Sequence, residues 1–208
     1  MYKLPLYTIT FLFACSAYLQ SNGQNIVCGA DYLHNKLSAS NPAYAAKTQT
    51  IESQVQHLLR NMPHVPLDAV YSIPVVVHVI HLGEPIGTGT NISDSQITVA
   101  IRGLNNRWRN ANPMGGVNMD MQFCLASRDP NGNVTTGINR VNASGIPNYA
   151  AHGISMVYSN CDAPSEATIK GLSKWPVSDY YNIWVVNQIC QGFGGIVGVA
   201  YYPWGADI

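Results

Sequence analysis

The sequence predicts an α/β fold: one packed domain with a twisted sheet and a helix that backs it. Two stretches carry this prediction. The run "YSIPVVVHVIH", Tyr71–His81, is β-branched and almost continuously apolar, which is typical of a strand covered on both faces. The run that begins at Ser93 has apolar residues at helical spacing, which predicts an amphipathic helix. Strands and helices that follow one another in this way are typical of α/β domains.

The stretch before residue 70 differs from the rest of the chain. "NPAYAAKTQTIESQVQHLLRNMPHVP" predicts one amphipathic helix, and two prolines, Pro63 and Pro66, end it. Its apolar face consists of Ile51, Val55, Leu58 and Leu59. These four residues are too few to form a hydrophobic core by themselves, so we expect the segment to dock on another part of the protein.

The elements after residue 70 follow in order. Ser93 and Gln96 have the spacing of a capping box, and Pro113 ends the predicted helix. The stretches at 119–132, 179–190 and 196–203 predict three further strands. Residues 134–174 are rich in Gly and Asn and only weakly patterned. This order of elements indicates an α/β domain whose sheet is incomplete.

With 208 residues, the chain has room for one substantial domain and an N-terminal extension. Hydrophobic residues make up 47%, which is enough for a packed core, and charged residues make up 11%, against roughly 25% in an average soluble domain. The 11 basic and 11 acidic side chains give a formal net charge of zero, and they form no basic block. Nucleic acid and anionic membranes are therefore not expected as partners.

The first residues predict a signal peptide at 1–23. Lys3 precedes the apolar run Leu4–Ala14, which is too short to span a bilayer, and small residues near Ala17 and Gly23 follow. We therefore expect a secreted, extracellular protein. The sequence "LFAC", which ends at Cys15, also resembles a lipoprotein signal, so a lipid anchor at Cys15 is the alternative.

Export makes disulfides possible. Four cysteines follow the signal: Cys28, Cys124, Cys161 and Cys190. One interpretation pairs all four. The other leaves Cys28 free and gives the remaining three, an odd number, a partner outside this chain. The spacing does not decide between these two interpretations.

The sequence contains no familiar catalytic motif. His78 and His81 are three residues apart, but on a strand their side chains point to opposite faces, so we predict no metal site there. H-E-x-x-H, G-x-S-x-G and the phosphate-binding loop signature do not occur, and the carboxylates are scattered. Residue chemistry alone predicts an exported α/β domain without a recognisable active site.

Five stretches together resemble a known family. They are "IPVVVHVIH", "ISDSQITVAIRGLNNRWRNAN", "MQFCLASRDPNGNVTTGINRV", "DYYNIWVVNQIC" and "GGIVGVAYYP". In this order and spacing they resemble the N-terminal half of the pappalysin-type metzincins, which are secreted zinc metalloproteases. The resemblance is to the bacterial branch, ulilysin- and cytophagalysin-like, and it covers residues 70 to 203.

This resemblance implies a metzincin-like N-terminal subdomain, with a mostly parallel sheet, an antiparallel edge strand and a backing helix. In the family, a helix with H-E-x-x-H-x-x-G-x-x-H follows; its three histidines bind the catalytic zinc, and its Glu moves a proton. This chain contains no such motif. We therefore expect a fragment of a longer precursor, inactive by itself. Zinc, and the calcium that family members can carry, would be bound outside it.

The resemblance also implies roles for residues of this chain. "VCGAD" lies where bacterial pappalysins carry the Cys-Gly of a pro-segment, so Cys28 is expected to be a latency cysteine. Its thiolate would bind zinc in the zymogen and take the place of the catalytic water; a structural disulfide is the alternative. The sheet edge that pairs with extended substrate is expected at Gly198, Val199, Ala200, Tyr201 and Tyr202. Arg60, at the end of the predicted helix, is the candidate processing site.

These predictions combine into a secreted zinc metalloendopeptidase precursor. It has a signal peptide at 1–23, a pro-segment at 24–69 and the N-terminal part of the catalytic domain at 70–208, and it acts on protein or peptide substrates. The alternative, from another class, is a non-catalytic secreted β-rich binding or adhesion module. The sequence that follows "WGADI" distinguishes the two, because only the protease requires a zinc-binding helix there.

Overall fold

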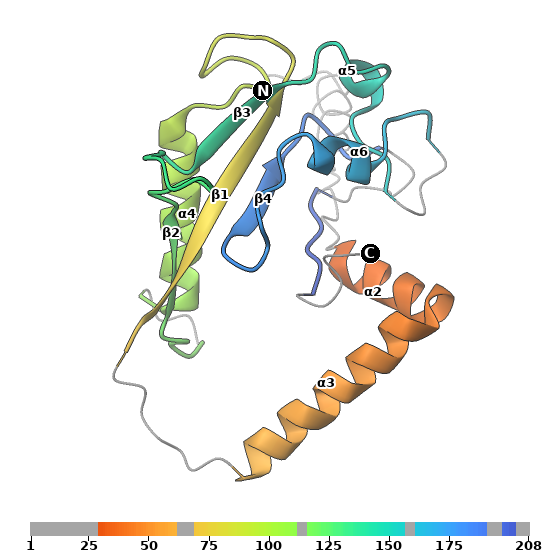
Figure 1. The fold of residues 1–208 in the computed structure, drawn as a ribbon, viewed down its shortest axis with the longest axis vertical. Coiled ribbons are helices and arrows are strands. Elements are labelled where there is room, and N and C mark those ends of the chain that lie inside the picture. Colours follow the sequence, from red (N-terminus) through yellow and green to blue (C-terminus); the bar gives the residue numbers. More distant parts are fainter. Residues whose placement is uncertain (1–28, 62–68, 112–115, 157–160, 191–196, 203–208) are drawn as a thin grey trace, which may run out of the picture.

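The structure is a computed structural model, and it describes residues 29–61, 69–111, 116–156, 161–190 and 197–202. The predicted signal peptide and Cys28 lie outside these residues. The elements in chain order (Figure 1) are α2 (Gly29–Ser40), α3 (Pro42–Asn61), β1 (Tyr71–His81), α4 (Asp94–Trp108), β2 (Met121–Leu125), β3 (Ile138–Asn142), α5 (Tyr149–His152), α6 (Glu166–Gly171) and β4 (Tyr181–Val185).

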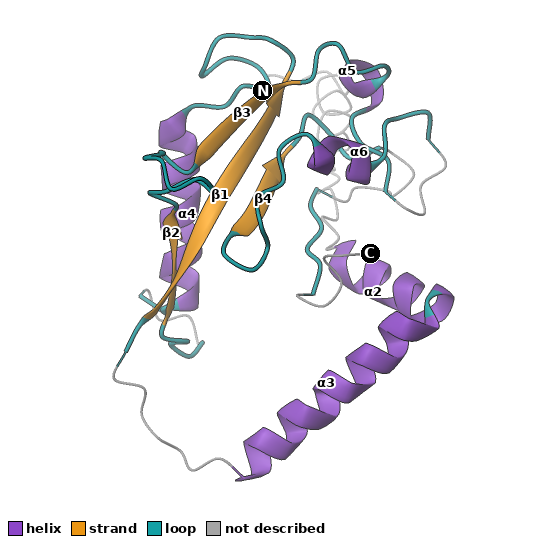
Figure 2. Ribbon diagram, in the orientation of Figure 1, coloured by secondary structure: helices purple, strands orange, loops and turns teal. Residues whose placement is uncertain are grey.

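β1 is the central strand of a four-stranded sheet, and each pairing among the described strands is parallel. β2 pairs with the first half of β1 and β3 with its second half. The backbone of Val75 bonds to Ala126 and that of Val77 to Gly137, so β2 and β3 follow one another along the same side of β1. β4 pairs with the middle of β1 on the other side (Figure 2). The predicted fold class, α/β with a mostly parallel sheet, is confirmed.

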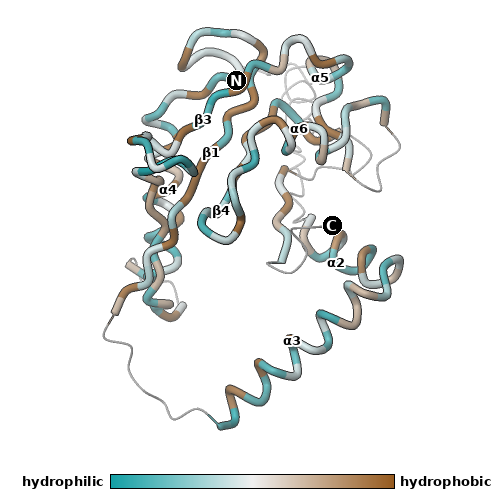
Figure 3. Tube along the Cα trace, viewed as in Figure 1, coloured by the Kyte–Doolittle hydropathy of each residue, from teal (hydrophilic) through white to brown (hydrophobic). Residues whose placement is uncertain are grey.

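The side chains of β1 alternate between two hydrophobic layers. The first core cluster contains Val75, Val77 and Val79 of β1, Ile97 of α4 and Phe123 of β2. The second core cluster lies on the opposite face and contains Leu33, Leu37, Tyr44, Ile80, Ala143, Tyr149, Ile154, Met156 and Ile169. All six residues at 75–80 are buried, so β1 is covered on both faces, as predicted. Figure 3 shows the corresponding hydrophobic stretch along β1.

α4 covers the first face of the sheet and begins at the predicted capping box. The Ser93 hydroxyl accepts a hydrogen bond from the Gln96 backbone N–H, and the Gln96 side chain accepts one from the Ser93 N–H. The residues predicted at helical spacing pack toward the first core cluster: Ile97, Ile101, Leu104 and Trp108. This helix and its predicted start are therefore confirmed; it ends at Trp108, and Pro113, which is predicted to end it, lies outside the described residues.

α2 and α3 form a helical pair that precedes the sheet. α2, which the sequence pattern does not predict, buries Leu33 and Leu37 in the second core cluster. The helix predicted within the stretch at 41–66 is confirmed as α3, and Tyr44 near its start is buried in the same cluster. Its predicted apolar face is nevertheless open to solvent toward the C-terminal end, where Val55 is 45% and Leu59 is 72% exposed.

Two further differences concern the sheet. β3 forms in the stretch at 134–174 in which the sequence patterning predicts no element. Residues 197–202 form no strand, although 196–203 is predicted to be the fourth, and so the expected antiparallel edge strand is not formed by the described residues. Among the described residues, the strands beside β1 are β2, β3 and β4.

Two of the cysteines whose pairing the spacing leaves open are bonded to one another. A disulfide joins Cys161 to Cys190. Cys124, on β2, is exposed and has no disulfide partner among the described residues. A membrane-spanning helix does not occur in the described part of the chain, where no helix combines the necessary length and apolar character.

Candidate functional site

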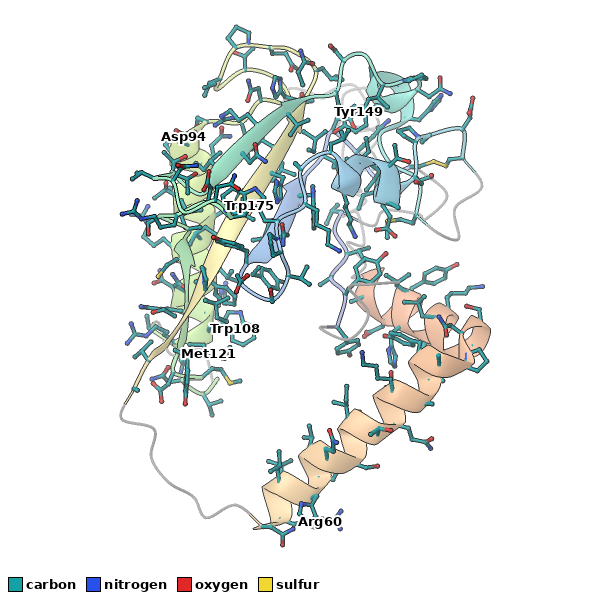
Figure 4. The ribbon with its side chains drawn as sticks, in the orientation of Figure 1. Arg60, Asp94, Trp108, Met121, Tyr149 and Trp175 are labelled. Carbon is teal, nitrogen blue, oxygen red and sulfur yellow. A yellow bond between two sulfur atoms is a disulfide. The ribbon has the colours of Figure 1, made fainter. Side chains whose placement is uncertain are left out.

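The segment at 197–202, which contains the residues expected to bind substrate (198–202), lies against α6 and α2 (Figure 4). Val199 and Tyr201 are half-buried and pack on the second core cluster, whereas Gly198, Ala200 and Tyr202 are exposed. This alternation is typical of an extended backbone, although no ladder of strand hydrogen bonds forms. The structure therefore places the five predicted residues in one extended segment, and three of them are exposed.

α6 provides a salt bridge next to this segment. The N-cap Ser165 hydroxyl accepts a hydrogen bond from the Thr168 N–H, which fixes the start of this short helix. Glu166 and Lys170 follow one turn apart, and their Oε2 and Nζ atoms are 2.9 Å apart. The Tyr201 hydroxyl donates a hydrogen bond to the other carboxylate oxygen, Oε1. These contacts join α6 directly to the candidate substrate segment.

α2 contacts the same segment through aromatic rings. The His34 ring lies edge-on to the Tyr202 ring, with 5.1 Å between their centroids. His34 Nδ1 is also within 2.9 Å of the Tyr44 hydroxyl of α3. Burial raises the pKa of Tyr44 above its usual value, and the neighbouring Tyr202 adds to this effect. Tyr44 is therefore a neutral hydroxyl at the junction of α2, α3 and the segment.

The two histidines of β1 lie in different surroundings. His78 is fully buried; its ring stacks on Trp184 with 5.0 Å between centroids, and Nε2 is 2.9 Å from Asn182 Oδ1. His81 is half-buried, and its Nδ1 accepts a hydrogen bond from the Gly83 N–H at 3.0 Å. The structure does not bring these two rings together.

The donor set for a catalytic metal is not found in the described part of the chain. Among these residues, no three His, Cys, Asp or Glu side chains lie close enough together to hold a metal ion. A catalytic zinc requires three protein ligands and an open position. The described residues therefore do not fit a zinc centre, and no step of a metal-assisted reaction is assigned to them.

The remaining predicted residues lie apart from this segment. Arg60 is exposed at the far end of α3 (Figure 4), and its Nε donates a hydrogen bond to the Gln56 carbonyl in the preceding turn. Cys28 lies outside the described residues. Gly29, directly after it, is buried at the start of α2.

Glu166 and Lys170 are not among the site residues predicted from the sequence. A signal was present, because Ser165 precedes the stretch "EATIK" and Glu166 and Lys170 have the i,i+4 spacing of a helical ion pair. Such pairs are common on solvated helix faces, and only the fold reveals that this one meets Tyr201.

Two solved structures resemble this chain. Mirolysin in complex with compound 9 is 31% identical to it with a TM-score of 0.50, and the match covers 66% of this chain and 48% of that chain. A point mutant of promirolysin from Tannerella forsythia is 26% identical with a TM-score of 0.53, and the match covers 86% of this chain and 54% of that chain. The chain matches no protein-family model and no curated protein. It thus spans about half the length of the two structures, and its fold is related to that of mirolysin and promirolysin.

Proposed function

We propose that this chain is the N-terminal part of a secreted zinc metalloendopeptidase precursor. Residues 1–23 would be the signal peptide, 24–69 the pro-segment, and 70–208 the first part of the catalytic domain. The observation that carries the proposal is the match to promirolysin, the pro-form of a metallopeptidase, at 26% identity over 86% of this chain. The five stretches that resemble pappalysins, in order, support the same assignment.

The extents of the two matches support a pro-segment. Promirolysin matches 86% of the chain and mirolysin 66%, and the difference of 20% corresponds to about 42 of the 208 residues. The described residues of α2 and α3, 29–61, together with the linker up to residue 69, are of this length. This is the expected relation if α2 and α3 belong to a segment that the pro-form carries and the mature form has lost.

The site supports different roles for the two halves of such a protein: the N-terminal half would bind the peptide substrate, and the half that follows would bind the zinc. Residues 198–202 would provide the backbone that binds an extended peptide substrate, and α2 covers this segment in the precursor. Cys28, immediately before α2, would bind the zinc of the zymogen. The zinc, when bound by ligands outside the described residues, would supply the activated water for peptide hydrolysis.

The decisive experiment uses the complete reading frame. We expect a zinc-binding helix to be encoded after Ile208, and we expect the purified complete protein, after processing, to hydrolyse a quenched fluorescent peptide library. A chelator should abolish this hydrolysis and added zinc should restore it. A stop codon or a sorting domain directly after Ile208, or a processed protein that cleaves no peptide, would contradict the protease and favour a secreted binding module.

A further inference from the structure

Glu166 is a buried carboxylate in a short helix. With His78 and Asn91 it makes up the buried polar side chains of the described residues, and only 9% of its side chain is exposed. A buried carboxylate is costly unless both of its oxygens are paired. Here Lys170 binds one oxygen and the Tyr201 hydroxyl binds the other. Both carboxylate oxygens of Glu166 are thus paired, and among the described residues its side-chain partner outside α6 is Tyr201.

Tyr201 is held at its ring as well as at its hydroxyl. The Lys170 Nζ lies 4.3 Å from the centroid of the Tyr201 ring and 5.4 Å from that of Trp184, which belongs to β4. A cation at these distances is attracted to the face of an aromatic ring. A single ammonium group therefore connects α6, β4 and the segment at 197–202.

The contacts of this segment divide into two groups. Leu33, Leu37 and Tyr44 share the second core cluster with Val199 and Tyr201, and all three belong to the proposed pro-segment. Glu166, Lys170 and Trp184 belong to the proposed catalytic domain. Loss of the pro-segment would remove the first group of contacts and leave the second.

We infer that Glu166, together with Lys170, is a positioning residue that keeps residues 197–202 in place once the pro-segment has left. It acts through Tyr201 and so orients the backbone that would pair with a peptide substrate. This inference rests on the proposed function, but the geometric part is independent of it: Glu166 and Lys170 restrain the segment whether or not the complete protein is a protease.

The geometric part is tested on the 208-residue chain by hydrogen exchange and mass spectrometry. Tyr201→Phe removes the hydroxyl and keeps the ring. We expect the amides at 197–202 to exchange about tenfold faster, as expected for the loss of a hydrogen bond to a charged group. Glu166→Gln keeps an acceptor for Tyr201 but removes the charge that binds Lys170, so we expect a smaller increase. The amides of β1 should keep their rates, which shows that the fold is intact.

Asp94→Asn is the matched control, because Asp94 also pairs with a cation, Arg140, but lies on α4. It should leave exchange at 197–202 unchanged. Unchanged exchange in both Tyr201→Phe and Glu166→Gln would overturn the inference, and so would an equal acceleration in Asp94→Asn.

The substrate part is tested on the complete protein after removal of the pro-segment. We expect Tyr201→Phe to raise KM about tenfold for a long peptide and to leave kcat within about twofold, because the reacting groups are not touched. A lower kcat with unchanged KM would overturn the positioning role. If the wild-type protein cleaves no peptide while amide exchange at 197–202 is accelerated in Tyr201→Phe and Glu166→Gln, the proposed function is wrong. The restraint of the segment by Glu166 is then still supported.

Discussion

His78 connects two strands and a loop through one buried ring. The Asn182 side chain accepts a hydrogen bond from the Trp175 N–H with Oδ1 and donates from Nδ2 to the Trp175 carbonyl, so the orientation of its amide is fixed. Oδ1 can therefore only accept from His78 Nε2, and the proton of the neutral ring lies on that nitrogen. The Nδ1 atom accepts from Asn139 Nδ2 at 3.3 Å. His78 is thus satisfied as a neutral side chain.

This arrangement predicts a loss of stability in weak acid. Burial lowers the pKa of His78 below its usual value of 6.5, although the hydrogen bond to Asn182 partly opposes this. The unfolded chain then binds more protons than the folded chain below pH 6.5, so the free energy of unfolding falls as the pH decreases from 6.5 toward the lower pKa of the folded state. Urea unfolding at pH 7.5 and 5.5 measures this loss.

Two variants separate the effect of His78 from that of His81. In His78→Gln the difference in the free energy of unfolding between pH 7.5 and 5.5 should be smaller than in the wild type, even though the variant is less stable at both pH values. His81→Gln should keep the wild-type difference, because this half-buried ring lies on the opposite face of β1. An undiminished difference in His78→Gln would contradict the assignment.

At the scale of the elements, helices and strands with a strong local sequence pattern could be predicted, whereas those that depend on long-range contacts could not. β1 and α4 were predictable because a continuous apolar run and a capping box are decided within the segment itself. β3 was not, because its five residues are only half-buried or exposed and its Arg140 is held by Asn91 and Asp94, far away in sequence. The sequence predicts a strand at 196–203, but the described residues 197–202 form no strand and pack through Val199 and Tyr201.

The edge of β2 is closed by a helix side chain. Asn105 of α4 donates from Nδ2 to the Phe123 carbonyl at 2.8 Å and accepts from the Phe123 N–H at 2.7 Å. These are the two groups that a neighbouring strand would otherwise bind, and an open edge invites pairing with another chain. Asn105 therefore takes the place of an additional strand at this position.

We expect Asn105→Ala to lower the free energy of unfolding by about 1–3 kcal/mol, because it leaves the N–H and C=O groups of Phe123 without these partners. Asn106→Ala is the matched control; this exposed residue lies next to it on the same helix and should change stability by less than about 0.5 kcal/mol. Urea unfolding measures both variants. Similar values for the two would show that the edge contact does not stabilise the protein.

At the scale of the whole molecule, the candidate site could be predicted only in part. The resemblance to pappalysins predicts a substrate-binding segment at 198–202, and in the structure this segment contacts α2 and α6, with Val199 and Tyr201 half-buried. The role of α2 could not be predicted, because its two buried leucines give too weak a pattern until Tyr44, Val199 and Tyr201 pack around them. α2 and α3 thus share the second core cluster with the sheet. Release of α2 and α3 should therefore expose the face of the sheet that they help to cover.

This shared core leads to a prediction about latency. Gly29 is buried at the start of α2, so the residue that follows Cys28 is fixed in the protein interior. If Cys28 binds the zinc of the complete precursor, Cys28→Ala should admit water to the metal. We then expect the mature form to appear at least about tenfold earlier during incubation of the purified precursor, with a new N-terminus at Asn61 if Arg60 is the processing site.

N-terminal sequencing of samples taken over time measures both the rate and the position of cleavage. Cys124→Ala is the control, since this cysteine is exposed on β2 and has no disulfide partner among the described residues; it should mature at the wild-type rate. Equal maturation of Cys28→Ala and the wild type would exclude a latency role for the thiol. A new N-terminus distant from residue 61 would exclude Arg60 as the processing site but would not contradict the role proposed for Cys28, because Cys28 precedes α2 in the sequence and Arg60 is near the end of α3.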